Sequence, residues 1–390
     1  MATLKALGSF KLALVLVILL IVFSLAGALL PQESLFASDT IARWQEDHPL
    51  VTSLLRPLGL FRVFHSIPFL VTIVLLAVNT LACTVVHIVK EGGLCALKGP
   101  TAVRNLAFIV LHLSLIGLMA GGFLGAAARL DGYIILTEGQ SFRETHGGYT
   151  RLQEGPLRRE QHKGFVFRLE KVEITYEQKW FPVEVTSRLG ILPNGSEREQ
   201  AVIKVNRPLD YRGFSFTQDQ TGFSPRLAIR HRQRGRVLVD SFVALKTFST
   251  DRGRQYRDFL PLPLFKQRVI VTLYPAYTLV NGQVEKSGEE PDNPLLLVEM
   301  EDENGCVQPV GHILQGDTIS VEDYTIAFAG LRRWSSFRVV QDPGYPVAWI
   351  SLWLGVAAIV LRYVPELARW FRSSRDLGSD SPTGGQHDTD

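Results

Sequence analysis

Hydrophobic residues gather in four segments of this 390-residue chain, three of them within its first 128 residues. Leu12–Leu30, Ile67–Val89 and Leu106–Ala128 contain no acidic residue, lysine or arginine. Each has close to the ~20 apolar residues that a helix needs to cross a bilayer. The fourth segment, Val347–Val364, is shorter and carries Arg362 near one end, where a long side chain can reach the headgroups. We therefore predict a membrane protein with four transmembrane helices rather than a soluble enzyme.

A long, mostly polar stretch separates the third span from the fourth. Its hydrophobic residues alternate in short runs, and turn-forming segments such as Pro193-Asn194-Gly195 and Asn281-Gly282 lie between the runs. No helical window of comparable strength occurs, so we predict a β-sandwich or barrel-like domain in which Thr250–Arg257 is a loop. The runs expected to form strands are Phe165–Tyr176, Pro182–Leu189, Ala201–Val205, Phe214–Phe216, Arg226–Ile229, Val237–Phe242, Arg268–Tyr274, Pro294–Glu299 and Tyr324–Phe328.

These patterns divide the chain into four parts. Residues 1–128 form a membrane domain with helices at 12–30, 67–89 and 106–128, and residues 129–345 form the β-rich domain. Residues 346–364 form the fourth transmembrane helix. Residues 365–390 form a tail whose end is rich in Ser, Asp and Gly, and we expect it to be disordered. An A-x-A match at residues 26–28 resembles a signal-peptide cleavage site, but the apolar run continues through Leu30, which favours an uncleaved anchor.

Lysine and arginine are unevenly distributed around the spans. Those before span one, between spans two and three and after span four outnumber those between spans one and two, which acidic residues offset. The positive-inside rule then puts both termini in the cytoplasm and the large domain outside. The membrane is the cell inner or plasma membrane, or a thylakoid membrane if the source is photosynthetic. The residues on the inner side are Lys5, Lys11, Lys90, Lys98, Arg104, Arg369, Arg372 and Arg375; the others are Arg43, Arg56 and Arg62.

The remaining composition excludes several kinds of chemistry. A net charge of +3 with no dense basic run gives no nucleic-acid signature. The cysteines Cys83, Cys95 and Cys306 form no C-x-x-C pair, so the chain cannot run a thiol–disulfide relay alone. The cysteine and histidine spacings match no zinc motif.

The outer domain carries no recognisable catalytic motif. It has no Gly-rich phosphate loop, no nucleophile elbow and no paired carboxylates of clear spacing. Its histidines, His146, His162, His231 and His312, are expected to be solvated. A scaffold or binding role is therefore favoured over a hydrolase.

One ionisable residue lies deep in a predicted span. His112 is about 9 Å from the cytoplasmic boundary of the third span, at ~1.5 Å per residue, so we expect it to be neutral and to have a partner. A neutral imidazole can ligate haem iron or form a hydrogen bond within the bundle, and both interpretations stay open. Gly117, Gly121 and Gly125 lie roughly 140° to 220° round the helix from His112. We expect that glycine face to pack against another helix.

The other polar residues of span two have simpler expected roles. Asn79 is predicted to form an interhelical hydrogen bond rather than a transport site. His65 and His87 lie at the outer and inner ends of the span, where polar residues are common.

Short motifs follow one another along the chain. Span one closes on Pro31-Gln32, Leu58-Gly59-Leu60 precedes span two, and Cys83-Thr84 lies near the end of span two. The series continues with His112, Glu138-Gly139-Gln140, Val205–Gln220 (VNRPLDYRGFSFTQDQ) and Val339–Gly344. Together these motifs resemble the ResB family of System II cytochrome c biogenesis, over the whole chain to Val364. The most specific residues are Asn206, Pro208, Leu209, Tyr211, Gly213, Asp342, Pro343 and Gly344.

The resemblance implies a concrete function. ResB-type proteins work with a ResC/CcsA-type membrane protein, and the pair carries haem outward and joins it to apocytochrome c. The resemblance further implies that His112 is an axial ligand of haem b, held transiently and shared with the partner. Separate thioredoxin-like proteins would reduce the apocytochrome cysteines. The chain would then be a non-catalytic or co-catalytic subunit of a cytochrome c haem lyase or synthase.

Two other interpretations belong to different classes. A ResB-like membrane scaffold without haem traffic would bind partner spans through the glycine face and an outer ligand through the β-rich domain. A small-molecule transporter is disfavoured, because the four spans show no inverted repeat and almost no polar interior. Haem bound to the purified complex distinguishes the synthase subunit from the scaffold.

Overall fold

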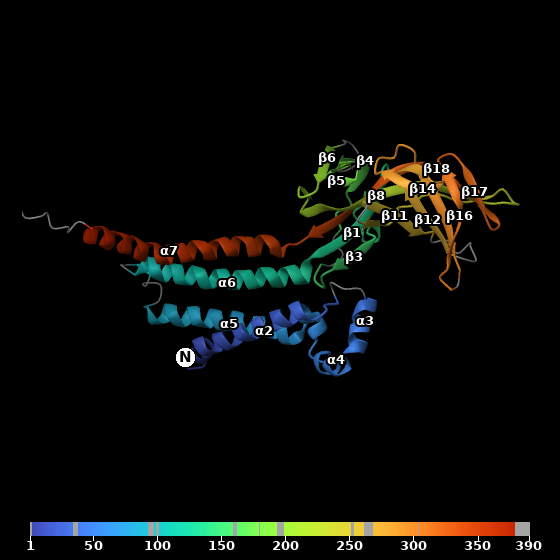
Figure 1. The fold of residues 1–390 in the computed structure, drawn as a ribbon. Coiled ribbons are helices and arrows are strands. Elements are labelled where there is room, and N and C mark those ends of the chain that lie inside the picture. Colours follow the sequence, from blue (N-terminus) through green and yellow to red (C-terminus); the bar gives the residue numbers. More distant parts are fainter. Residues whose placement is uncertain are drawn as a thin grey trace, which may run out of the picture. The chain divides into compact units, whose positions relative to one another are not determined.

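The computed structural model describes residues 2–33, 38–92, 97–98, 101–158, 162–178, 180–192, 199–250, 253–260, 268–302 and 304–378. It contains two compact units (Figure 1). A helical unit comprises Met1–Ala126 and Pro343–Asp390, and a β-rich unit comprises Ala127–Asp342. The turn expected at Pro193-Asn194-Gly195 and the loop cysteine Cys95 lie outside the described residues.

Four apolar helices of the helical unit are long enough to cross a membrane, as predicted. They are α2 (Phe10–Leu29), α5 (Ile67–Lys90), α6 (Ala102–Ala128) and α7 (Gly344–Gly378), and a short α1 (Ala2–Leu7) precedes them. Serine side chains begin two of the helices, because a hydroxyl can accept from an N–H group that has no partner in the first turn. Ser9 accepts from the Leu12 N–H at 3.2 Å, and Ser66 from the Phe69 N–H at 3.4 Å.

The expected disorder from residue 365 onward is wrong for the first part of that tail. Helix α7 continues to Gly378. The stretch after Pro365 contains Glu, Leu, Ala and Arg, which favour helix, and a glycine stands where the helix ends. A low-complexity composition therefore describes only the residues beyond that glycine, which lie outside the described part.

The connection between α2 and α5 is largely helical. It contains α3 (Ser38–Asp47), α4 (Pro49–Leu55) and the 3₁₀ segment η1 (Leu60–His65). The buried Gln32 side chain joins the end of α2 to η1: its amide nitrogen donates to the Leu60 carbonyl at 3.1 Å, and its oxygen accepts from the Val63 N–H at 3.1 Å. One motif residue thus provides both a donor and an acceptor where two backbone segments meet.

Helices α6 and α7 approach each other through glycine. A Cβ atom built on Gly121 would lie 2.7 Å from the Ala348 nitrogen, and one built on Gly117 would collide with the Ser351 hydroxyl. Gly344, at the start of α7, is equally crowded by the backbone of Gly121 and Gly125. Missing side chains on both helices permit this close approach.

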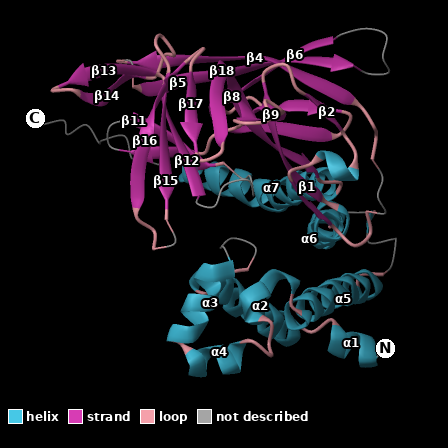
Figure 2. Cartoon of the chain, turned by 90° about the vertical axis from the view of Figure 1, so that its right-hand side faces the viewer, coloured by secondary structure: helices cyan, strands magenta, loops and turns pink. Residues whose placement is uncertain are grey.

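The β-rich unit is built from antiparallel sheets. A seven-stranded sheet has the order β3-β1-β18-β8-β7, with β17 on β18 and β9 on β8; a four-stranded sheet has the order β2-β4-β5-β6, and a five-stranded sheet β10-β11-β12-β15-β16. The hairpin β13–β14 lies at the margin of the unit (Figure 2). The strands are β1 (Leu130–Thr137), β2 (Ser141–Arg143), β3 (Arg151–Glu154), β4 (Val166–Glu177), β5 (Phe181–Leu192), β6 (Glu199–Lys204), β7 (Leu209–Tyr211), β8 (Phe214–His231), β9 (Val237–Phe242), β10 (Thr247–Thr250), β11 (Gly253–Phe259), β12 (Arg268–Tyr274), β13 (Ala276–Val280), β14 (Gln283–Gly288), β15 (Leu295–Glu301), β16 (Val307–Leu314), β17 (Thr318–Val321) and β18 (Tyr324–Gln341).

Two separate hydrophobic cores share the long strands β8 and β18. One core contains Phe216 and Phe337 together with residues of the four-stranded sheet, and the other contains Phe223 and Phe328 together with residues of the five-stranded sheet. A β-rich domain was expected, and the arrangement is a tandem of two sandwich-like lobes built on one continuous sheet.

A buried polar layer separates the two cores. Ser187 donates to the Gln218 oxygen at 2.7 Å, and the Gln218 amide donates to Ser335 at 2.6 Å. All three side chains are buried. Their hydrogen bonds satisfy the polar groups, as burial requires.

This polar layer explains where the strand predictions were wrong. Phe214–Phe216 and Arg226–Ile229 belong to one strand, β8, and β18 continues well beyond Phe328. The polar residues between the hydrophobic runs resemble a turn in sequence, but they hydrogen-bond inside the sheet. The expected loop Thr250–Arg257 is also wrong, because β11 begins at Gly253.

Candidate functional site

The imidazole of His112 lies on α6 and is partly buried within the helical unit. Its Nδ1 is 2.9 Å from the carbonyl oxygen of Phe108, one turn earlier. A carbonyl oxygen can only accept, so the neutral ring carries its proton on Nδ1 and leaves the lone pair of Nε2 available. A backbone carbonyl that orients the far nitrogen in this way is a frequent companion of metal-ligating histidines.

A second histidine of the spans lies near His112. The rings of His87 on α5 and His112 on α6 each lie about 4 Å from the Phe108 ring, with centroid distances of 4.0 and 3.9 Å. His87 Nε2 is buried and has no hydrogen-bond partner among the described residues. His87 was expected to be an ordinary interfacial residue, and sequence spacing gives no signal that it shares an aromatic neighbour with His112.

The other motif residues of span two act on the backbone. Thr84 is buried and donates to the Thr80 carbonyl at 2.8 Å. Cys83 lies where Gly8, the residue after α1, approaches: a Cβ atom on Gly8 would lie 2.8 Å from the Cys83 nitrogen. Asn79 donates to the carbonyls of Leu7 and Ser9, the latter at 3.2 Å, which confirms its predicted interhelical hydrogen bond. The contacts of Asn79 and of Gly8 join α5 to the N-terminal segment, whereas the Thr84 hydrogen bond lies within α5.

The VNRPLDYRGF motif is a compact hairpin in the β-rich unit. Residues Lys204 and Arg207 bridge across a tight turn in which Asn206 has φ +62°, and Pro208 and Leu209 then lead into the short strand β7. Tyr211 pairs with Phe214 across a second turn, where Arg212 and Gly213 have φ +51° and +83°. Asn and Gly tolerate this left-handed backbone, so the motif residues meet the requirements of turns rather than of a ligand.

The motif Asp342-Pro343-Gly344 lies where the β-rich unit ends and the helical unit resumes. Asp342 lies 3.8 Å from the Arg129 guanidinium, which also pairs with Asp131 at 2.9 Å. Pro343 and Gly344 begin the second segment of the helical unit.

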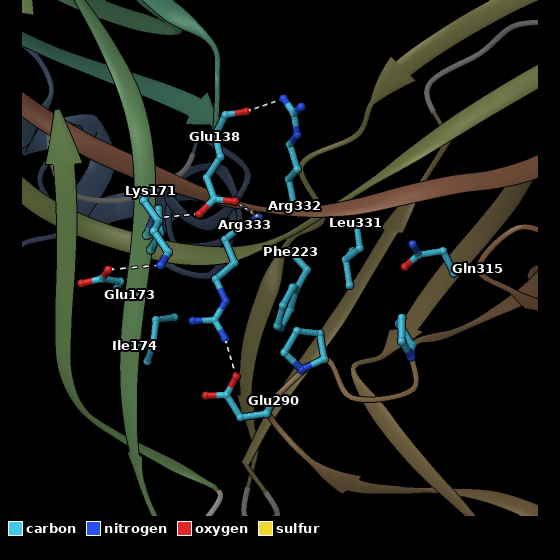
Figure 3. Close-up of a pocket in the computed structure, with 13 residues that line it drawn as sticks. Glu138, Lys171, Glu173, Ile174, Phe223, Glu290, Gln315, Leu331, Arg332 and Arg333 are labelled. Carbon is cyan, nitrogen blue, oxygen red and sulfur yellow. Dashed lines mark hydrogen bonds and ion pairs between the residues drawn. The ribbon is translucent and has the colours of Figure 1, made fainter. Parts of the chain in front are cut away.

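An open hollow of about 460 Å³ lies on the β-rich unit (Figure 3). Glu138, from the Glu138-Gly139-Gln140 motif, accepts from the N–H groups of Val172 at 2.8 Å and Arg333 at 3.2 Å. The Arg333 guanidinium pairs with Glu290 at 2.9 Å and lies over the rings of Phe223 and Tyr176. Burial raises the pKa of Tyr176 to about 12, so its hydroxyl stays protonated. The hollow therefore offers paired charges and apolar surface.

The histidines of the β-rich unit differ from the expectation. His146 and His312 are exposed, as predicted, but the side chain of His162 is only 12% exposed. Its Nδ1 lies 2.6 Å from the Glu144 carboxylate. His162 is buried because separate segments of the chain come together around it, so the spacing of residues along the chain could not have predicted its burial.

Four membrane-length helices together with a large β-rich unit define this chain as a membrane protein. The chain belongs to the ResB-like family, whose model matches residues 10–91 and 86–387. The resemblance drawn from the motifs is therefore confirmed.

Two relatives of this chain are named as cytochrome c biogenesis proteins. The chain is 22% identical to "Cytochrome c biogenesis protein Ccs1" of Rhodomonas salina, over 94% of this chain and 89% of that protein. It is 23% identical to "Cytochrome c biogenesis protein CcsB" of Thermosynechococcus vestitus, over 94% and 88%. A solved chain, "Cytochrome c Heme Lyase CcmF", superposes with a TM-score of 0.28 at 15% identity, over 81% of this chain and 34% of that one. That superposition is too loose to define a common fold.

Proposed function

We propose that this chain is the membrane subunit of a System II c-type cytochrome synthase. Its membership of the ResB-like family and the names of its relatives support a role in cytochrome c biogenesis. In this role haem is the cargo, His112 provides one axial ligand, and a ResC/CcsA-type partner provides the other. The product of the complex is a c-type cytochrome with haem attached.

The hydrogen bond between His112 Nδ1 and the Phe108 carbonyl is the observation that supports His112 as the axial ligand. It holds the imidazole in the tautomer whose Nε2 can ligate iron, so the ring need not change its tautomer when haem arrives. The glycine face of α6 is consistent with this role of His112, because helix packing uses a different face of the same helix. Gly117 and Gly121 lie against α7, which leaves the imidazole on another face of the helix.

We further propose that the β-rich unit is extracytoplasmic and receives the apocytochrome. The hollow beside Glu138 and Arg333 has the mixed charge and aromatic lining that a polypeptide segment can occupy. Cys306 is a free, exposed thiol and no second described cysteine lies in this unit. Reduction of the apocytochrome thiols is therefore assigned to separate thioredoxin-like proteins.

The test is the absorption spectrum of the chain purified with its membrane partner. Wild type is compared with His112→Ala and with His65→Ala, which removes an exposed histidine from the end of η1, just before α5. We expect a Soret band in the wild type and in His65→Ala. The band should be lost in His112→Ala and restored by added imidazole, which can replace the missing ligand.

Two other outcomes count against the proposal. Stoichiometric haem that His112→Ala leaves unchanged assigns both ligands to the partner. An intact complex that carries no haem in any sample favours the scaffold interpretation. The complex itself is checked by co-purification of the partner in every variant.

A further inference from the structure

Four side chains outside the proposed haem site meet between β2 and β4. Glu144 follows β2, His146 lies in the 3₁₀ turn η3 (His146–Gly148), Glu154 ends β3, and His162 precedes β4. One ligand atom from each of His146, Glu154 and His162 can be chosen so that all three lie within 4.8 Å of one another. We propose that these three residues bind one divalent transition-metal ion of the zinc type.

The buried Glu144 determines which nitrogen of His162 is available. Its carboxylate accepts from His162 Nδ1 at 2.6 Å, from the Tyr149 hydroxyl at 3.1 Å and from two backbone N–H groups, those of Lys163 and of Gly164. Burial and the adjacent carboxylate raise the pKa of Tyr149, so its hydroxyl remains a donor. The neutral His162 ring therefore keeps its proton on Nδ1 and turns the lone pair of Nε2 toward Glu154.

Two acceptors then face each other. His162 Nε2 lies 3.9 Å from Glu154 Oε1, too far for a hydrogen bond, and it has no other hydrogen-bond partner among the described residues. A cation held by His162 Nε2 and by the other carboxylate oxygen, Glu154 Oε2, gives this nitrogen lone pair a partner. The carboxylate–histidine pair formed by Glu144 and His162 is also the usual support for a metal-bound imidazole.

The third ligand completes a His₂Glu set. His146 Nδ1 lies 3.1 Å from Glu154 Oε2, and the His146 side chain is 69% exposed, so an ion can enter from solvent. Bond lengths of about 2.0–2.1 Å in a tetrahedral site require ligand atoms roughly 3.3 Å apart. The separations of 3.1 Å for His146 and 3.9 Å for His162 from the Glu154 carboxylate lie on either side of that value, and water can supply the fourth ligand.

Arg158 is compatible with a bound ion. Its Nε lies 2.7 Å from Glu154 Oε1, and its Nη1 donates to Gln341 at 2.6 Å. Glu154 therefore keeps one oxygen on the guanidinium and offers the other, Oε2, to the ion. The two carboxylates of Glu144 and Glu154 outweigh this one positive charge, which leaves a net negative site.

The ligand set does not suit haem iron. A porphyrin occupies four positions around its iron and leaves only two axial ones. Three protein ligands on one side of a single point suit a free ion instead. This site is therefore separate from the proposed function of His112, and each can fail without the other.

The experiment uses the full chain in detergent, stripped with a chelator and titrated with Zn²⁺ by calorimetry. We expect one ion per chain in the wild type and in His312→Ala, which removes an exposed histidine elsewhere in the unit. His146→Ala and Glu154→Gln should each weaken binding at least tenfold. Glu144→Gln, which alters only the support of His162, should weaken it about 10- to 100-fold.

A second readout guards against misfolding. Co²⁺ in a tetrahedral site gives visible d–d bands, and zinc should raise the melting temperature of the wild type but not of His146→Ala. Because His146 is exposed, its removal should leave the metal-free melting temperature unchanged. Absence of binding in the wild type, or binding that His146→Ala and Glu154→Gln leave at full strength, overturns the proposal.

Discussion

Gly121 of α6 touches the backbone of Ala348 of α7, since a Cβ atom on Gly121 would lie 2.7 Å from the Ala348 nitrogen. The next residue, Gly122, has no atom of another element within 4 Å of the same position. Two adjacent glycines of one helix thus differ completely in what a methyl group would meet.

This difference gives the first prediction. Gly121→Ala should destabilise the packing of α6 on α7 by about 1–3 kcal/mol, because the clash is with backbone that cannot rotate away. Gly122→Ala should cost nothing, since its methyl group enters open space. Unfolding of the full chain in mixed micelles with increasing SDS measures both. Equal midpoints for the two variants would show that the helices do not pack through this glycine.

The second prediction concerns acid stability through Asp131. Burial opposes ionisation, but hydrogen bonds and charge from Arg338, together with Arg129, lower the pKa of Asp131 below its ordinary value. Arg338 holds both carboxylate oxygens, at 3.0 and 2.6 Å. A carboxyl group whose pKa is lower in the folded state stabilises the fold above about pH 4, and that stabilisation is lost as the pH falls through the folded-state pKa.

Wild type should therefore lose more stability than Asp131→Asn when the pH falls from about 5 to about 3. Urea midpoints at the two pH values measure the loss. Asp292→Asn, at an exposed position, should behave as wild type. A parallel decline of wild type and Asp131→Asn would remove Asp131 from the acid response.

The third prediction concerns the hairpin of the VNRPLDYRGF motif. Gly213→Ala places a side chain at φ +83° and should cost about 1–2 kcal/mol in the free energy of unfolding. Gly147→Ala, in a turn with open space and no positive φ, should have little effect. Chemical denaturation of the two variants is the comparison. A harmless Gly213→Ala would imply that the turn relaxes to another type.

The fourth prediction concerns a buried ion pair. Glu289 is fully buried and accepts from Lys286 at 2.6 Å, from the Tyr256 hydroxyl at 2.7 Å and from the Arg254 N–H at 2.8 Å. Glu289→Ala leaves the Lys286 charge without its partner and should cost about 3–5 kcal/mol. The exposed Glu285 is the control, and Glu285→Ala should change the unfolding midpoint little. Similar midpoints for both variants would mean that water reaches Lys286.

The fifth prediction tests the proposed orientation. Cys306 is exposed in the β-rich unit, so a membrane-impermeant maleimide should label the chain in intact cells if that unit lies outside. The chain used for this test carries Cys95→Ser, and adding Cys306→Ser should abolish the labelling, because the remaining Cys83 lies within the spanning helix α5. Labelling that appears only after the cells are permeabilised would place the unit in the cytoplasm.

Local sequence patterns were sufficient to predict those elements whose formation depends on one physical requirement acting along the chain. A bilayer demands continuous apolar length, and this requirement correctly indicated α2, α5, α6 and α7. Alternation identified strands such as Arg268–Tyr274, whose bounds agree with β12. The glycine and asparagine of the VNRPLDYRGF motif lie where the backbone is left-handed, a requirement that residue type alone reveals.

Tertiary structure decided the features that depend on distant partners. Gln218 and Ser335 resemble turn residues in sequence, yet they hydrogen-bond inside the shared sheet, so β8 and β18 run through both cores. His146, Glu154 and His162 come from a 3₁₀ turn, a strand end and a loop, and they meet only when β2, β3 and β4 are placed. The sequence by itself determined the membrane spans, the β-rich class and the family, because each depends on local residue character. Only the fold decided which polar groups are buried together, because that depends on strand register and on contacts far apart in the chain.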